Sequence, residues 1–168
     1  TTPASAVPPR LAERNAPITG AARGIGLGIA ERFAAEGAGL LLVDVLEGEL
    51  VGAAESLRAK GATVQVVAID LSAPDASDII ARQAARAFGR IDILVNNAGI
   101  GVVGTIEDFD AAAWDRVLTI NLTAAFLLAK QFVPPMAAAG HGRVINISSM
   151  NGLIGMTGSG VGAGAMVG

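Results

Sequence analysis

The 168-residue chain has no cysteine, no tyrosine and only one histidine, His141. Without cysteine it can form neither disulfides nor thiolate metal sites, and it has no cysteine nucleophile. A lone histidine without cysteine partners disfavours a metal or catalytic role, and "AAGHGR" around His141 is typical of a surface turn. We therefore expect no metal cofactor. The missing cysteines leave the compartment open, and the cytoplasm is the location we expect.

Long hydrophobic runs and excess positive charge are also missing. The longest aliphatic run is Leu40–Val43, far short of the ~20 residues that a membrane-spanning helix needs. This holds although hydrophobic residues make up 52% of the chain and the mean hydropathy is +0.55. The net charge of −3 and the pI of about 5.1 indicate no basic patch. We expect neither a membrane nor nucleic acid as a partner.

What is present is a regular alternation of short apolar runs and helical patterns. The spacing of Ile25, Ile29 and Phe33, for example, predicts a helix. Strands are expected over 15–19, 40–44, 63–70, 91–96 and 143–148. Helices are expected over 24–36, 47–60, from Ser72 or Asp75 to 88, and over 111–133, the last broken at Pro134 and Pro135. This order predicts an α/β fold, a Rossmann-like doubly wound parallel sheet with strand order 3-2-1-4-5.

A glycine-rich loop follows the first expected strand. Residues 19–26 read "TGAARGIG", with glycines at 20, 24 and 26 where the strand gives way to a helix. Such glycines allow a tight turn, a close approach to an anion and close helix–strand packing, and the helix amides then face phosphate groups. Asp44 lies 18 residues past Gly26, at the end of the second strand, where a carboxylate can accept hydrogen bonds from a ribose. The alternative is an ordinary turn with an exposed aspartate.

Several motifs together resemble the classical short-chain dehydrogenases/reductases. Over roughly residues 11 to 160 they are "TGAARGIG", Asp44, "DL" (70–71), "NNAG" (96–99), Asn121 in "TINLTAAF", and "NISS" (146–149). The resemblance implies an NAD(P)-dependent oxidoreductase acting on an alcohol or ketone as small-molecule substrate, and a homo-oligomer. The implied cofactor-binding residues are Gly20, Ala21, Ala22, Arg23, Gly24, Ile25, Gly26, Asp44, Asp70, Leu71, Asn97, Ala98 and Gly99.

Asp44 also bears on the choice between NAD and NADP. A carboxylate there would repel a 2′-phosphate, and neither Val45 nor Leu46 supplies a compensating positive charge. Arg23 could contact a phosphate but could equally lie beside the pyrophosphate or in solvent. We expect NAD as the cofactor, with NADP disfavoured.

By the same resemblance Ser149 and Asn121 are the catalytic residues. The family also uses a Tyr-x-x-x-Lys pair about thirteen residues past the serine, which falls on Gly162 and Met166 here. The only lysines are Lys60 and Lys130, so the usual proton donor is missing.

Two further departures accompany this gap. Pro17 lies in the expected central strand, where proline is rarely tolerated. The family also continues beyond residue 168, so the fifth strand is expected to be an exposed apolar edge. We expect a disordered lead-in over 1–10, an NAD-binding Rossmann-like domain over 11–158 and a degenerate Gly/Ala-rich tail over 159–168. Three functions stay open: an oxidoreductase, an inactive dinucleotide-binding domain, or a truncated fragment without independent function.

Overall fold

The structure, a computed structural model, describes residues 9–102, 107 and 109–149. Its centre is a parallel five-stranded sheet in the order β3-β2-β1-β4-β5. The strands are β1 (Asn15–Thr19), β2 (Gly39–Asp44), β3 (Val64–Ala68), β4 (Ile93–Asn96) and β5 (Arg143–Asn146). Fold class and strand order are as the sequence predicts, although the last three strands are shorter than expected.

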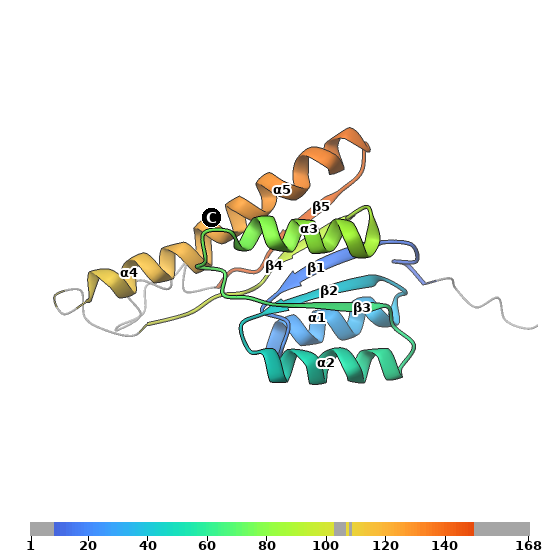
Figure 1. Ribbon diagram of the computed structural model, residues 1–168, viewed down its shortest axis with the longest axis horizontal. Helices are drawn as coiled ribbons and strands as arrows, with labels where there is room; N and C mark the ends of the chain where they lie inside the picture. The colour runs from blue at the N-terminus through green and yellow to red at the C-terminus, as the bar shows by residue number, and fades with distance from the viewer. Residues whose placement is uncertain (1–8, 103–106, 108, 150–168) are drawn as a thin grey trace, which may run out of the picture.

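Helices cover both faces of this sheet (Figure 1). On one face lie α1 (Gly24–Ala35) and α2 (Glu47–Ala59); on the other lie α3 (Ala76–Phe88) and α5 (Ala124–Ala138). Two short elements, α4 (Ala111–Leu118) and the π-helical turn η1 (Thr119–Thr123), lead into α5. The doubly wound arrangement brings the carboxyl ends of β1, β2, β3 and β4 to one edge of the sheet, where such folds bind ligands.

The core has two layers because successive residues of a strand point to opposite faces. Leu40 and Leu42 pack with residues of α1 and α2, whereas Leu41 and Val43 pack with residues of α3 and α5. All four side chains are essentially inaccessible to solvent. A continuous apolar run in β2 is thus explained by burial on both faces, as in other parallel sheets.

The expected strand over 15–19 forms with Pro17 inside it, although proline is rarely tolerated in a central strand. Pro17 is buried in β1 and lies opposite Leu41 of β2 in an unbroken register. The N–H and C=O of Asn15 both bond to Asp92, just before β4. Because backbone groups point alternately to the two neighbouring strands, the backbone nitrogen of Pro17 also faces β4. The missing donor therefore falls on the β1–β4 ladder, which has a single register pair, Ile18 with Val95. Hydrogen bonds at both ends of β1 hold the two strands together instead.

The long helix also continues through Pro134 and Pro135, so the expected break there is wrong. Proline has no N–H, so the backbone carbonyl one turn earlier lacks its helical hydrogen bond. Both prolines are exposed, and water can bond to those carbonyls instead. Phe132 and Met136 anchor the same turns in the core. The irregularity lies instead at η1, around Asn121.

By length and composition alone, the helical stretch Ala111–Ala138 (28 residues) could cross a membrane: its most apolar 18-residue segment has a mean hydropathy of 1.4, and 28% of that segment is buried. One such helix is weak evidence for a membrane span, and α5 buries Leu128, Phe132 and Met136 in the core.

The fifth strand is exposed along its length, with Val144 and Ile145 at 40% and 38% of full exposure.

At the other end of the chain, residues 1–8 of the expected lead-in lie outside the described residues. Arg10 is described, and its N–H and guanidinium both donate to Glu36. The expected tail over 159–168, with Gly162 and Met166, also lies outside the described residues.

Candidate cofactor-binding site

The glycine loop is shaped by two requirements that only glycine meets. Gly24 opens α1 with φ +59°, a left-handed conformation that side chains disfavour, and nothing lies within 4 Å of the position where its Cβ would be. At Gly26 a Cβ would lie 2.1 Å from the carbonyl oxygen of Gly20. The open position at Gly24 leaves space in front of the helix amides. The missing Cβ at Gly26 lets α1 pack directly on the end of β1.

A threonine and an asparagine fix this loop to β4. Thr19 is 2% exposed, and its Oγ1 accepts the backbone N–H groups of Asn97 and Ala98, both at 3.0 Å. The Asn97 Nδ2 donates to the carbonyls of Thr19 at 2.9 Å and Gly20 at 3.1 Å. Both donor hydrogens of the Asn97 amide are therefore used inside the protein, which makes this side chain a brace for the loop.

Asp44 is held by backbone amides from two segments. Its Oδ2 accepts the N–H of Ala22 at 3.0 Å and its Oδ1 accepts the N–H of Leu46 at 3.1 Å. No basic side chain pairs with Asp44 among the described residues. The carboxylate is thus fixed at the end of β2, beside the glycine loop, with acceptor capacity left on both oxygens.

A cavity of about 290 Å³ opens along this edge of the sheet, and we call it the Asp44 cavity. Eight of the predicted cofactor-binding residues line it: Gly20, Arg23, Asp44, Asp70, Leu71, Asn97, Ala98 and Gly99. The other five lie in the loop and the first turn of α1 but not on the cavity wall: Ala21, Ala22, Gly24, Ile25 and Gly26. Of these, Ile25 is 66% exposed, so its side chain is available at the surface of the loop.

Asp70 also lines the Asp44 cavity, in the turn after β3. Its Oδ1 accepts the N–H of Ser72 at 2.8 Å and the Ser72 hydroxyl at 2.7 Å, and its Oδ2 accepts Arg116 Nη2 at 3.1 Å. These bonds, those from Ser72 first, hold the pKa of Asp70 below its usual range. Asp70 is therefore an ionised, oriented acceptor at neutral pH.

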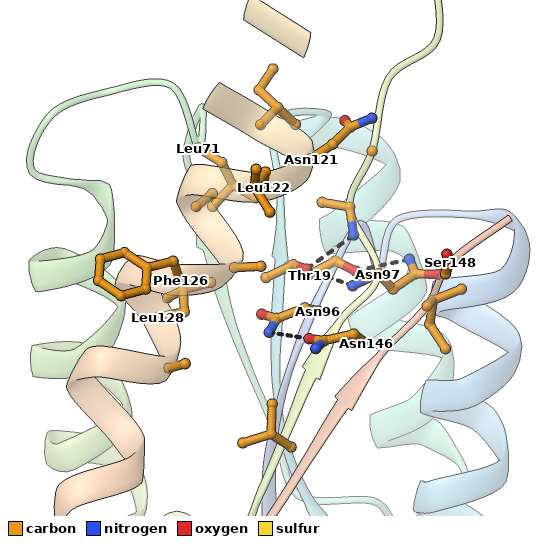
Figure 2. Close-up of a pocket in the computed structure, with 18 residues that line it drawn as sticks. Thr19, Leu71, Asn96, Asn97, Asn121, Leu122, Phe126, Leu128, Asn146 and Ser148 are labelled. Carbon is orange, nitrogen blue, oxygen red and sulfur yellow. Dashed lines mark hydrogen bonds between the residues drawn. The ribbon is translucent and has the colours of Figure 1, made fainter. Parts of the chain in front are cut away.

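A second cavity of about 240 Å³ lies between α5 and the ends of β4 and β5 (Figure 2). Asn96, Asn121, Asn146 and Ser148 are among its lining residues. Figure 2 shows the bond from Asn96 Nδ2 to Asn146 Oδ1, at 2.9 Å. The Asn96 Oδ1 is buried and has no partner among the described residues.

The two predicted catalytic residues lie on different elements. Asn121 is in η1, where its Oδ1 accepts the Ile100 N–H and its Nδ2 donates to the Ile100 carbonyl, both at 2.9 Å. Its side chain is thus bound to the backbone after β4, so its amide braces the end of that strand. Ser149 follows β5, and Ser148 lines the second cavity.

Sequence reasoning missed three residues of this region. Thr19 opens the quoted motif and could have been recognised by its place at the end of β1. Asn146 begins "NISS", but its bond to Asn96 depends on the pairing of β4 with β5. Arg116 carries no signal in the sequence, because only the path of α4 brings it to Asp70.

Comparison with known proteins decides the family. The sequence profile described as short chain dehydrogenase matches residues 14–164. The chain belongs to the short-chain dehydrogenase family. It is 43% identical over 157 residues to the trans-4-hydroxycyclohexanecarboxylate dehydrogenase of Sinomonas cyclohexanicum, a match that covers 90% of this chain and 60% of that protein. It is 40% identical over 146 residues to the 3-alpha-(or 20-beta)-hydroxysteroid dehydrogenase of Mycobacterium bovis, covering 87% of this chain and 55% of that protein.

Solved structures of short-chain dehydrogenases share the fold. One from Burkholderia phymatum, in complex with NAD, has a TM-score of 0.89 at 32% identity and covers 93% of this chain and 56% of that one. A metagenomic short-chain oxidoreductase in complex with NADP has a TM-score of 0.89 at 36% identity, covering 93% and 71%. The chain spans about 55–60% of the length of the curated relatives named above.

Proposed function

We propose that this short-chain dehydrogenase chain forms the cofactor-binding part of an NAD-dependent oxidoreductase that interconverts a secondary alcohol and a ketone. Membership of the family supports the reaction class, as do the dehydrogenase activities named for its relatives. The single observation that carries the cofactor assignment is the Asp44 carboxylate, fixed by two amides on the wall of the cavity beside the glycine loop.

The residues present fit a nicotinamide dinucleotide. Open space in front of Gly24 and the amides at the start of α1 suit a pyrophosphate. We assign Gly20, Gly24, Gly26 and the intervening backbone to this group. Asp44 would hold the adenosine ribose, and Asp70 and Leu71 would hold the adenine. When bound, the dinucleotide supplies or accepts the hydride, while the residues of this chain bind and orient it.

The preference for NAD follows from the charges around Asp44. A 2′-phosphate at the ribose would meet a carboxylate that no described basic side chain neutralises. Arg23, which lines the same cavity, lies 3.9 Å from Glu49, and both side chains are more than half exposed. A solvated pair of this kind contributes little, so the proposed preference rests on the fixed Asp44 carboxylate and not on the position of Arg23.

Ser149 and Asn121 are the catalytic groups that we assign to this chain. We propose that Ser149 hydrogen-bonds the reacting oxygen and that Asn121 supports the proton relay by fixing η1 against Ile100. The 168 residues contain no tyrosine to serve as general acid or base. For that reason the same chain, taken alone, should bind cofactor far better than it turns over substrate.

We extend the proposal to partners, location and boundaries. A small-molecule alcohol or ketone is the proposed substrate class, a homo-oligomer is proposed from the family resemblance, and a cytoplasmic location is proposed as well. The dinucleotide-binding unit is assigned to residues 11–158. Gel filtration with light scattering, and cell fractionation, test the assembly and the location.

Equilibrium binding tests the central assignment. Isothermal titration calorimetry of the purified protein with NAD and with NADP should give tighter binding of NAD by roughly 10-fold or more, since charged hydrogen bonds are worth ~1.5–3 kcal/mol. Equal or tighter binding of NADP would contradict the role of Asp44. Failure to bind either dinucleotide would contradict the proposed function itself.

A further inference from the structure

Arg116 is the one residue of α4 that reaches the wall of the Asp44 cavity. Its guanidinium donates to the Asp70 Oδ2 at 3.1 Å, across 46 positions of sequence. The side chains are 55% and 35% exposed, so this bond lies at the mouth of the cavity and not in the core. This bond links α4 to the turn after β3.

The Asp70 carboxylate is anchored at both oxygens. Ser72 fixes Oδ1 through its N–H and its hydroxyl, and Arg116 fixes Oδ2. A carboxylate oxygen can accept two hydrogen bonds, so Oδ2 keeps one free direction. With both ends held, the plane of the carboxylate is set before any ligand arrives.

We propose that Arg116 is a positioning residue for adenine recognition, holding Asp70 so that its Oδ2 accepts the exocyclic amino group of adenine. This inference rests on the proposed function, because it assumes that the adenine of a dinucleotide lies beside Asp70 in the cavity. An ionised carboxylate only accepts hydrogen bonds. It therefore favours a base that carries an amino group over one that carries a carbonyl oxygen at the same place.

The charge balance of the cavity agrees with this role. The wall carries two carboxylates, Asp44 and Asp70, and two guanidiniums, Arg23 and Arg116. Arg116 is engaged with Asp70, and Arg23 points toward Glu49 outside the cavity wall. Asp70 thus remains ionised while its net charge is offset, which lets it select the base without repelling the phosphates as strongly as Asp44 repels a 2′-phosphate.

The test compares NAD with nicotinamide hypoxanthine dinucleotide, which has a carbonyl oxygen in place of the adenine amino group. Dissociation constants for both are measured by calorimetry on the wild-type protein and on Arg116→Ala and Arg116→Lys. The control is Arg82→Ala, which removes an exposed arginine of α3 that has no ion pair among the described residues. Circular dichroism confirms that each variant is folded.

The wild type should prefer NAD by roughly 10-fold or more, as expected for a hydrogen bond to a charged acceptor. Arg116→Ala should reduce that preference by roughly 3- to 10-fold, mainly by weakening NAD, because one of the anchors of Asp70 remains. Arg116→Lys should recover part of the preference, since a lysine keeps the charge but not the planar fork. Arg82→Ala should leave it unchanged.

A merely structural role would weaken both dinucleotides equally and leave the preference unchanged, and that result overturns the inference. Unaltered binding of both dinucleotides by Arg116→Ala also overturns the inference. If the wild type binds NAD and Arg116→Ala keeps the same preference for NAD over the hypoxanthine dinucleotide, only this inference is refuted. No NAD binding by the folded wild type refutes the proposed function, and the inference with it.

Discussion

The Asn97 side chain donates to the Thr19 carbonyl at 2.9 Å while the Thr19 hydroxyl accepts the Asn97 N–H at 3.0 Å. This reciprocal pair joins the last residue of β1 to the residue that follows β4. Since the glycine loop starts at the next position, Gly20, the pair determines where the loop begins. The geometry of the site therefore depends on a buried residue, Thr19, bonded to Asn97 on the cavity wall.

Replacing Thr19 with valine should destabilise the protein by ~1–3 kcal/mol. Valine has nearly the same shape but no hydroxyl, so the N–H groups of Asn97 and Ala98 lose their acceptor in a buried place. Urea unfolding followed by circular dichroism measures the change. Thr19→Ser keeps the hydroxyl and should retain most of the stability; a larger loss in Thr19→Ser than in Thr19→Val would show that the methyl group, not the hydrogen bonds, matters.

Two glycines of α1 should respond in opposite directions to alanine. A Cβ at Gly26 would lie 2.1 Å from the Gly20 carbonyl oxygen, so Gly26→Ala should cost ~1–3 kcal/mol and weaken dinucleotide binding. Gly28 is exposed two residues later, with nothing within 4 Å of its Cβ position. Gly28→Ala should stabilise the helix by ~0.5–1 kcal/mol. If Gly26→Ala were as stable as Gly28→Ala, the close approach of α1 to β1 would be wrong.

Acid should weaken the protein partly through Asp92, which is 1% exposed at the amino end of β4. Burial raises the pKa of Asp92, but the Asn15 N–H and the guanidiniums of Arg14 and Arg90 outweigh it and leave that pKa below its ordinary value. His141 Nε2 lies 3.9 Å away. A lowered folded pKa stabilises the protein above the unfolded pKa of ~3.9, and this contribution is lost as the pH falls through the folded value.

The measurement is the free energy of unfolding against pH for wild type and Asp92→Asn. The variant should be less stable by ~1–3 kcal/mol at pH 7, and the gap should narrow below pH ~4. Glu36 and Asp70 also have lowered pKa values, so both proteins lose some stability in acid. A gap that stays constant down to pH 2 would show that Asp92 does not contribute through its charge.

The 168-residue polypeptide should show little turnover of secondary alcohols or ketones with NAD(H). It contains no tyrosine, and its last lysine is Lys130, so Ser149 has neither of the residues that usually assist it. Loss of general acid–base help costs a factor of ~10²–10⁴. Absorbance of reduced nicotinamide, on protein of confirmed mass and beside a full-length relative, measures this. Robust turnover that disappears in Ser149→Ala would mean that another group transfers the proton.

Most of the fold could be predicted because its signals are local. Buried strands such as Leu40–Val43 are continuous apolar runs, and the glycine loop and Asp44 fall at strand ends once the order of elements is known. The exceptions lie where tertiary packing outweighs a local rule. Pro17 is accommodated because its missing donor falls on the short β1–β4 ladder, and the helix passes Pro134 because neighbouring turns are anchored in the core. Arg116 reaches Asp70 only through the folded chain.

The most direct test of the account is the ratio of NAD to NADP affinity in Asp44→Ala. Removing the carboxylate should weaken NAD and relieve the repulsion of the 2′-phosphate, so that the ratio falls by roughly 10- to 100-fold. Glu55→Gln, which neutralises an exposed carboxylate on α2, is the matched control and should leave the ratio unchanged. A fall confined to Asp44→Ala is the predicted result. An unchanged ratio in a folded Asp44→Ala protein would contradict the assignment of Asp44 as the residue that selects NAD.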